Sequence, residues 1–226
     1  MSNASRLVIR RDFPRPPREA IEALRGVGTS AACDAQDRTG ALHAALRPLT
    51  RARRFVGPVL PVQAGPKDNL ATYAALAVAR PGDVVLITNG AYDACAAVGG
   101  IWMGMAANAG IAGCVTDGAA RDLAELEATG VPVFAAGTSP NSPFKNGPGA
   151  VGLPISLGGV AVAPGDVALA DEDGVVVVPL ATLDRFLEAV ADVQRREAEM
   201  SAWVADGMTA PPWLEGLLAS PAVEWR

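Results

Sequence analysis

Histidine is nearly absent from this chain of 226 residues, which contains only His43. A single imidazole excludes a two-histidine metal site, and any Ser-His-Asp triad would have to be built on that one residue. No carboxylate lies near His43 in the sequence. An isolated histidine of this kind is more often a surface or core residue than a catalytic one, so it is not assigned to the site.

Cysteine is scarce as well: Cys33, Cys95 and Cys114 are an odd number, with no C-x-x-C spacing. Each lies among alanine, glycine or valine residues, which is typical of buried reduced thiols, and a cytoplasmic location is expected. The N-terminus lacks an apolar secretory segment, and no run approaches the roughly 20 apolar residues of a membrane helix. The sequence therefore predicts an unprocessed, soluble protein without a membrane partner.

Basic clusters and phosphate-binding loops are missing too. The formal net charge is −5, and the densest basic group comprises Arg51, Arg53 and Arg54. No nucleic-acid footprint is visible, so a nucleic-acid partner is not expected. The chain has neither G-x-x-x-x-G-K-[ST] nor a G-x-G-x-x-G between a strand and a helix, which argues against a nucleotide enzyme.

Hydrophobic residues make up 50% of the chain, enough to bury a substantial core. Helical and β-rich stretches alternate in the central part, which predicts a largely parallel α/β core. The expected helices span residues 70–79, 101–109 and 122–129, and the expected strands span 84–88, 112–116 and 131–135. Asp68 is a candidate cap for the first of these helices.

The flanking segments have different patterns. Residues 1–17 read as an irregular arm, followed by helices over 18–24 and 31–36, the second with Ser30 as its N-cap. Residues 55–62 are β-rich, but their two prolines predict an edge or bent strand.

Short strands over 160–163, 167–170 and 175–178 indicate antiparallel or barrel-like structure beside the α/β core. A long helix is expected over 180–205, and the proline- and tryptophan-containing tail reads as an arm. We predict an N-terminal arm and helix over 1–25, one domain over 26–206 and a C-terminal arm over 207–226.

The most informative stretch is Gly113–Asp122, where an apolar run, a tight turn, an arginine and a carboxylate follow one another. The guanidinium of Arg121 could grip a carboxylate bidentately, and Asp122 offers the hard oxygen that magnesium or manganese prefers. The alternative is that Asp122 only caps the following helix and Arg121 is solvated. The spacing alone leaves both interpretations open.

Glu197 lies on the apolar stripe of the long helix, together with Val190, Val193, Met200 and Val204. A buried carboxylate without a partner is costly, so two interpretations follow. Either this end of the helix projects into water, or Glu197 meets a cation or metal, including one across a subunit interface.

Several motifs together resemble one family. They are Asp34-Ala-Gln-x-Arg38-x-Gly40, Leu46-Arg47-Pro48, Pro81-Gly82-Asp83, Thr116-Asp-Gly-x-x-Arg-Asp122, Pro164-Gly165-Asp166 and Ala170-Asp-x-Asp-Gly174. In this order they resemble the 4-hydroxy-4-methyl-2-oxoglutarate / 4-carboxy-4-hydroxy-2-oxoadipate aldolases. That family also contains the regulator of ribonuclease activity A and proteins formerly misnamed dimethylmenaquinone methyltransferases.

The resemblance implies an α/β fold of the swivelling β/β/α type, with a short-stranded β portion and a long C-terminal helix. It also implies a homotrimer or homohexamer with sites between subunits, and a retro-aldol cleavage that releases pyruvate with Mg²⁺ or Mn²⁺. By position, Arg121 matches the arginine that grips the 2-oxo acid, and Asp122 matches the metal ligand. Lys145 matches a lysine near the substrate, and Glu197 matches a glutamate from the neighbouring subunit.

One position departs from the resemblance. Aldolases of the family carry an acid after a glycine upstream of the arginine, whereas this chain has Gly99-Gly100. The missing charge is expected to weaken metal binding. The backbone N–H groups of Ile101 and Trp102, at a predicted helix N-terminus next to Gly99 and Gly100, could still bind a carboxylate or enolate oxygen.

Three functions therefore compete. The first is a metal-dependent lyase that releases pyruvate from a 4-hydroxy-2-oxo acid, with oxaloacetate decarboxylation as a side activity. The second is a divergent enzyme that uses the same pocket on another oxo or hydroxy acid. The third is a non-catalytic binding protein like the ribonuclease regulators, which Gly100 favours and Arg121, Asp122, Lys145 and Glu197 oppose.

Overall fold

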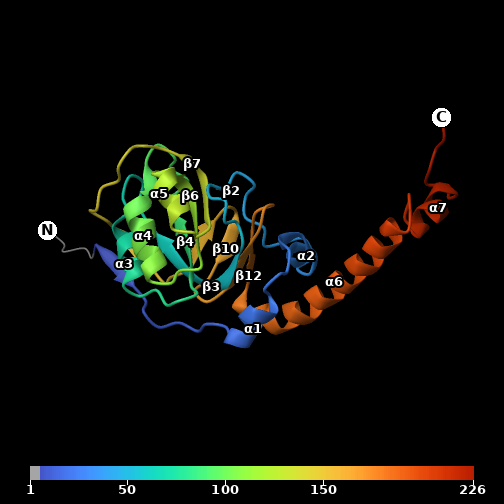
Figure 1. Ribbon diagram of the computed structural model, residues 1–226, viewed down its shortest axis with the longest axis horizontal. Helices are drawn as coiled ribbons and strands as arrows, with labels where there is room; N and C mark the ends of the chain where they lie inside the picture. Colours follow the sequence, from blue (N-terminus) through green and yellow to red (C-terminus); the bar gives the residue numbers. More distant parts are fainter. Residues whose placement is uncertain (1–5) are drawn as a thin grey trace. The chain divides into compact units, whose positions relative to one another are not determined.

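The computed structural model describes residues 6–226 and has the mixed α/β architecture that the sequence predicts (Figure 1). Its contacts divide the chain into two units, of which the first ends at Val190 and the second comprises Ala191–Arg226. None of the described helices combines the length and the hydropathy that crossing a bilayer requires.

A parallel core lies at the centre of the first unit. It consists of β3 (Phe55–Gln63), β4 (Val84–Thr88), β6 (Gly113–Ala120) and β7 (Val133–Thr138), and each of these strands pairs in parallel with the next. In the larger sheet they occupy the middle of the strand order, with β8 (Gly149–Val151) and then β1 (Leu7–Ile9) beyond β3, and β2 (Arg47–Pro48) beyond β7. The predicted parallel core is confirmed.

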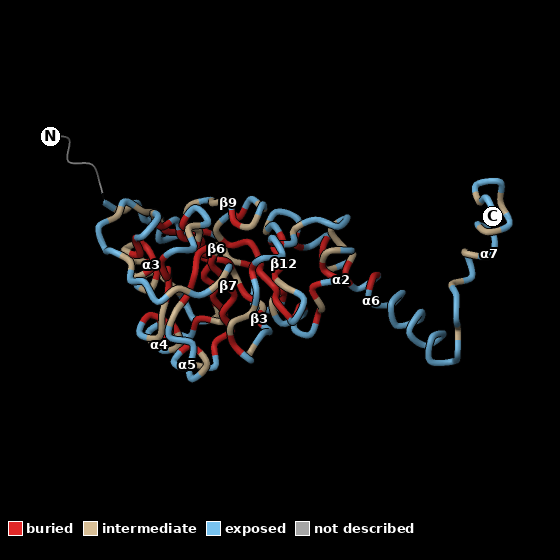
Figure 2. The backbone as a smooth tube through the Cα atoms, turned by 90° about the horizontal axis from the view of Figure 1, so that it is seen from above, coloured by how far each residue is buried: buried red, intermediate tan, exposed pale blue. Residues whose placement is uncertain are grey.

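The connections between these strands contain three helices, namely α3 (Leu70–Leu76), α4 (Gly100–Asn108) and α5 (Leu123–Ala128). A two-stranded sheet of β9 (Ile155–Leu157) and β10 (Val160–Val162) lies elsewhere in the unit. In Figure 2, α4 and α5 lie on one side of β6 and β7, whereas β9 lies on the other. The parallel strands are therefore covered on both faces, which explains their continuous burial.

The alternation of side chains along β4 divides the interior into two apolar clusters. Val85 and Ile87 pack with Trp102 and Met103 of α4 in one cluster. Leu86, on the opposite face, belongs to a second cluster with residues of β9, β10 and the hairpin of β11 (Val167–Ala170) and β12 (Val175–Val178). A helical layer, a central sheet and a second β layer result, in agreement with the expected β/β/α arrangement.

Of the two alternatives predicted for β3, an edge or a bent strand, the edge strand is wrong. β3 pairs with β4 on one side, and on the other side it changes partner along its length. Residues 55–58 pair with β11 (Val167–Ala170), and residues 62–63 pair with β8 (Gly149–Val151). Pro58 and Pro61 flank this change of partner, where fewer ladder hydrogen bonds have to be donated, so two prolines are tolerated in a central strand.

The hairpin of β11 and β12 (Val175–Val178) is confirmed at the predicted residues, and α1 (Arg18–Ala23) is close to its prediction. The N-cap of α2 (Thr29–Asp34) was predicted wrongly, because the cap is Gly28 rather than Ser30. Asp171, which follows β11, accepts hydrogen bonds from the backbone N–H and the hydroxyl of Thr29 at 2.8 and 2.7 Å. A distant carboxylate thus replaces the expected local cap.

Five short strands were not predicted, namely β1, β2, β5, β8 and β9. β1 (Leu7–Ile9) pairs with β8 in the segment expected to be an irregular arm. β2 (Arg47–Pro48) pairs with β7, and β5 (Ala96–Val98) pairs with β6. Residues 1–5 of the predicted arm lie outside the described residues.

The predicted long helix is confirmed, with a 3₁₀ turn (Leu180–Thr182) before α6 (Leu183–Ala205). The apolar stripe is buried in the first unit at Leu183, Phe186 and Val190. In the second unit, Met200 and Val204 are exposed, and the tail contains the short helix α7 (Pro212–Leu218) rather than only an irregular arm.

Candidate active site

Strand β6 delivers the Arg121-Asp122 pair to its site, but not through the turn that the sequence predicts. β6 does not end at Thr116; it continues to Ala120, with a register shift against β7 between Thr116 and Ala119. Within this irregular stretch, Asp117 accepts hydrogen bonds from the Thr88 hydroxyl at 2.7 Å and the Asn89 N–H at 2.8 Å. The strand end is thereby fixed to β4.

Asp122 has a left-handed backbone, with φ of 61°, at the junction between β6 and α5. Aspartate tolerates this conformation better than most residues. Its side chain makes no capping hydrogen bond to α5; instead, Oδ2 accepts the backbone N–H of Gly100 at 3.0 Å and lies 3.5 Å from Nε of Arg121. The interpretation of Asp122 as a simple side-chain cap is therefore wrong.

Arg121 is not a freely solvated side chain. About a third of its surface is exposed (33%), and its Nη1 donates a hydrogen bond to the hydroxyl of Ser142. Ser142 belongs to the polar loop after β7, so two segments far apart in sequence fix the guanidinium. A fork held in this way retains donors for an anion without having to be ordered on binding.

A small cavity of about 80 Å³ lies beside this pair. Its lining includes six residues singled out from the sequence: Gly99, Ile101, Trp102, Arg121, Asp122 and Lys145. They come from the start of α4, the end of β6 and the loop after β7. A guanidinium, a carboxylate and an ammonium group therefore converge on a space suited to a small acid.

The first turn of α4 forms one wall of the cavity. Gly99 is the N-cap, and the N–H of Gly100 is engaged by Asp122. The N–H groups of Ile101 and Trp102 have no carbonyl partner within the helix, because first-turn amides lack one. They remain donors at the positive end of a helix, where an anion is stabilised.

Glu125 fills the space that a side chain at position 100 would occupy. A Cβ atom at Gly100 would lie 2.5 Å from Cβ of Glu125 and 3.1 Å from its Cγ. Both distances are shorter than ordinary carbon contacts, so α4 and α5 approach each other here because Gly100 has no side chain. Glu125 brings a second carboxylate side chain to the neighbourhood of Asp122.

Several residues that line the cavity were not predicted from the sequence. Tyr73 of α3 lies under Lys145, whose Nζ is 5.4 Å from the ring centroid. Asn69 also lines the cavity, and within residues 6–226 its Oδ1 and the indole Nε1 of Trp102 are buried without a hydrogen-bond partner. The only local signal is Asp68 before the helix, which the sequence predicts to be the cap, whereas the structure has Asn69 as the N-cap.

Glu197 lies on the exposed part of α6, within the second unit. Its contribution to a neighbouring subunit's site remains a prediction. His43 is not among the cavity residues, and its Nδ1 accepts the N–H of Ala45 at 3.1 Å.

Comparison with known proteins agrees with this geometry. The RraA-like family, described as Aldolase/RraA, matches residues 29–177. The chain belongs to the Aldolase/RraA family. The matched segment contains Arg121, Asp122 and Lys145, whereas Glu197 lies beyond it.

Two relatives of this family are each named "Putative 4-hydroxy-4-methyl-2-oxoglutarate aldolase". The Halalkalibacterium halodurans protein is 35% identical over 190 residues, covering 84% of this chain and 90% of the relative. The Burkholderia multivorans protein is 39% identical over 155 residues, covering 66% and 94%.

Among solved structures, Streptomyces coelicolor RraAS2 is described as an unusual member of the RNase ES inhibitor RraA protein family. It aligns with a TM-score of 0.75 at 27% identity, covering 83% of this chain and 99% of that one. The family thus includes proteins named for two different activities.

The donor set of the site fits one type of metal binding found in proteins. Residues 6–226 contain no group of three or more His, Cys, Asp or Glu side chains arranged to hold an ion. Mg²⁺ is commonly held by one or two carboxylates, with water and substrate completing its shell. Asp122, with its side chain 40% exposed at the cavity, fits that open arrangement.

The cysteines are not candidate nucleophiles. Cys95 is buried near the site, and burial raises the pKa of its thiol although the charges of Arg121 and Lys67 oppose the shift. Complete burial raises the pKa of Cys114 to about 12. The thiolate is the reactive form, so both side chains are inert at neutral pH.

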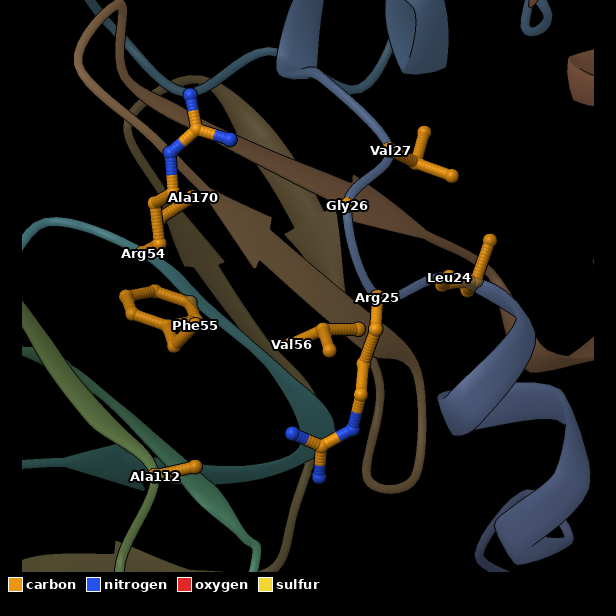
Figure 3. A pocket seen from close by; sticks show the side chains of 9 residues that line it. All are labelled: Leu24, Arg25, Gly26, Val27, Arg54, Phe55, Val56, Ala112 and Ala170. Atoms are coloured by element: carbon orange, nitrogen blue, oxygen red, sulfur yellow. The ribbon is translucent and has the colours of Figure 1, made fainter.

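A larger cavity, of about 370 Å³, lies between α1 and the strands β3 and β11 and contains two arginines (Figure 3). Arg25 is paired with Glu22, and Arg54 is paired with Glu172 at 2.9 Å. Figure 3 shows the two guanidinium groups pointing away from each other. Because both guanidinium groups are paired with glutamates and point in different directions, they do not form a site for a single anion.

Proposed function

We propose that this protein is a divalent-metal-dependent lyase that releases pyruvate from a 4-hydroxy-2-oxo acid by retro-aldol cleavage. The observation that carries the proposal is the convergence of Arg121, Asp122, Lys145 and the first-turn amides of α4 on one small cavity. The names of the Halalkalibacterium and Burkholderia relatives support the same reaction class.

Asp122 is the residue that would hold Mg²⁺ or Mn²⁺, and Cβ and Cγ of Glu125 pack against Gly100 beside it. When bound, the ion supplies Lewis-acid polarisation of the 2-oxo acid. The N–H of Gly100 and the guanidinium of Arg121 fix one oxygen of Asp122. This outer support keeps the carboxylate in one orientation.

In the cleavage, the substrate alcohol loses its proton and its oxygen forms a carbonyl at C4 as the C3–C4 bond breaks. The electron pair of that bond passes into the enolate of pyruvate, which then takes up a proton at C3. Arg121 binds the carboxylate and the keto oxygen, so its charge faces the developing enolate. The amides of Ile101 and Trp102 are the next donors to that charge. Preorganised donors of this kind typically contribute a few kcal/mol each in the transition state.

Lys145 holds the distal, anionic half of the substrate by charge. Glu197 of a neighbouring subunit is the group we propose to accept the proton of the alcohol, which requires a homotrimer or homohexamer. Oxaloacetate decarboxylation passes through the same pyruvate enolate, so it should accompany the aldol cleavage.

A coupled pyruvate assay on 4-hydroxy-2-oxo diacids and oxaloacetate, with and without Mg²⁺, tests the proposal. Arg121→Ala should lower kcat/KM by about 10²–10³-fold, because a donor to the developing charge is lost. Arg121→Lys should lose about tenfold or more, since it keeps the charge but not the fork.

Metal-dependent pyruvate release that is equal in the wild type and Arg121→Ala would contradict the assignment of Arg121. Silence on every oxo acid, together with tight binding of a ribonuclease, would instead favour the inhibitor function for which RraAS2 is named. Turnover of a different oxo or hydroxy acid would identify a divergent enzyme that uses the same pocket.

A further inference from the structure

Asp68 is a buried carboxylate, 8% exposed, immediately before α3. Its Oδ1 accepts the N–H of Leu70 at 2.9 Å, but the N-cap of α3 is Asn69, so the prediction of Asp68 as the cap is wrong. Its Oδ2 has a different partner: it accepts the N–H groups of Asn146 at 2.5 Å and Gly147 at 3.1 Å. Those two residues directly follow Lys145, so half of this carboxylate serves the loop that carries the lysine.

The loop is also fastened on the other side of Lys145. The N–H of Asn69 donates to the carbonyl of Phe144 at 2.9 Å, and the N–H of Phe144 donates to the carbonyl of Lys67 at 2.7 Å. The guanidinium of Arg6 adds hydrogen bonds to the carbonyls of Lys145 and Asn146, at 2.6 and 2.7 Å. The backbone at Lys145 is therefore held from both directions.

Asn69 connects this loop to the opposite wall of the cavity. It is 5% exposed, and its Nδ2 donates to the carbonyl of Ala97 at 3.2 Å. Ala97 lies in β5, which leads directly to the first turn of α4 and its N-cap Gly99. The Asp68-Asn69 dipeptide thus touches the backbone on both sides of the cavity.

We propose that Asp68-Asn69 is a positioning element that sets the place of Lys145 relative to Arg121 and the first turn of α4. Asp68 contacts backbone rather than substrate, so it acts through Lys145. The inference rests on the proposed function, because Lys145 is the residue assigned there to the distal anionic end of the substrate. The hydrogen bond to Leu70 alone would need only one oxygen of Asp68.

Asp68→Asn tests the proposal because an amide cannot accept hydrogen bonds on both sides. Its NH₂ group would face either the N–H of Leu70 or the N–H groups of Asn146 and Gly147, so one set of bonds is lost. Displacement of the loop should lower kcat/KM by about 10- to 100-fold, as misplacement of a binding group does. The loss should appear mainly in KM for a dianionic substrate.

A double-mutant cycle separates positioning from general damage. In a Lys145→Ala background, Asp68→Asn should change kcat/KM by less than about twofold, because the side chain that it positions is gone. If the loss of kcat/KM in the double variant equals the product of the losses in Asp68→Asn and Lys145→Ala, the proposal is overturned. Arg6→Ala, an exposed change that leaves α3 intact, provides a second variant and should give a smaller loss that also disappears in Lys145→Ala.

Asp166→Asn is the matched control. Asp166 is equally buried and accepts backbone N–H groups of Ala163 and Leu180 at 2.7 and 2.9 Å, but it does not line the cavity. It should lower stability without coupling to Lys145. Amide hydrogen exchange should accelerate at Asn146 and Gly147 in Asp68→Asn and remain unchanged there in Asp166→Asn.

Hydrogen exchange also distinguishes failure of this inference from failure of the proposed function. If the wild type releases no pyruvate and binds no 2-oxo acid by calorimetry, the proposed function is wrong, but faster exchange at residues 146–147 in Asp68→Asn still supports the positioning element. Unchanged exchange in Asp68→Asn overturns the positioning element, whatever activity is measured.

Discussion

Gly100 and Glu125 show how a single missing side chain sets the distance between two helices. The N–H of Gly100 orients Asp122, while the bare Cα of Gly100 admits the side chain of Glu125. An acid at position 100 and a side chain at position 125 therefore compete for the same space. At Gly100, the aliphatic part of the Glu125 side chain thus occupies the space that an acid would need.

Gly100→Ala is expected to lower the free energy of unfolding by about 1–3 kcal/mol, because its Cβ would lie 2.5 Å from Cβ of Glu125. Urea unfolding measures the loss. Glu125→Gly should relieve the strain in the double variant, since it removes the clashing Cβ. Glu125→Ala keeps that atom and serves as the control; equal rescue by both changes would contradict the packing argument.

At the level of elements, Asp171 joins the end of β11 to the start of α2. Burial on its own would raise the pKa of Asp171, but the N–H and hydroxyl of Thr29 and the N–H of Asp173 outweigh it and lower the pKa from its ordinary value of 3.8. The folded state then binds fewer protons than the unfolded chain. The stability that the carboxylate contributes is present above about pH 4 and is lost as the pH falls through the lowered pKa.

Thermal unfolding between pH 5 and pH 2 tests this link. The wild type should lose stability more steeply over that range than Asp171→Asn, which has no carboxylate to protonate. Asp173→Asn, an exposed change in the same turn, should retain the slope of the wild type. Parallel curves for the wild type and Asp171→Asn would show that Asp171 does not carry the acid sensitivity.

Elements that depend on local sequence were predicted correctly, whereas elements that form by pairing with distant strands were not. Strands β4, β11 and β12 were predicted correctly because each is an apolar run that follows a turn containing glycine and aspartate. β1 and β5 have three residues each and form only by pairing with distant strands, so no local pattern indicates them. The prolines of β3 predicted an edge or bent strand. A change of pairing partner within a strand, which tolerates these prolines in the centre of the sheet, cannot be recognised from composition.

The residues of the candidate site also differ in whether the sequence alone predicts them. Arg121 and Asp122 are adjacent in sequence, and their chemistry is visible there. Ser142 and Tyr73 depend on how the loop after β7 folds back, and Lys145 came only from the family resemblance. The bulge that carries β6 past Thr116 is stabilised by Asp117 and β4, which local turn chemistry does not include.

For the whole molecule, the proposed sharing of sites between subunits predicts complementation. Arg121→Ala and Glu197→Gln should each be impaired, whereas a mixed oligomer of the two should regain activity. Equal random mixing should restore about one quarter of the sites, because each needs the correct variant at two independent positions. Light scattering of the mixed sample and the pyruvate assay provide the measurements.

The matched control mixes Arg121→Ala with Asp122→Asn. These residues are neighbours in one chain, so no combination of such subunits rebuilds an intact site. Absence of recovery in the first mixture, in oligomers verified by mass to contain both variants, would assign Glu197 to its own subunit or to no site at all.

The central sheet also separates the effects of mutations on its two faces. Val85 and Ile87 belong to the cluster that includes Trp102, a wall of the cavity, whereas Leu86 and Phe134 face the second β layer. A substitution at Leu86 therefore changes the packing of the second β layer, whereas one at Val85 or Ile87 changes the cluster that supports the wall of the cavity.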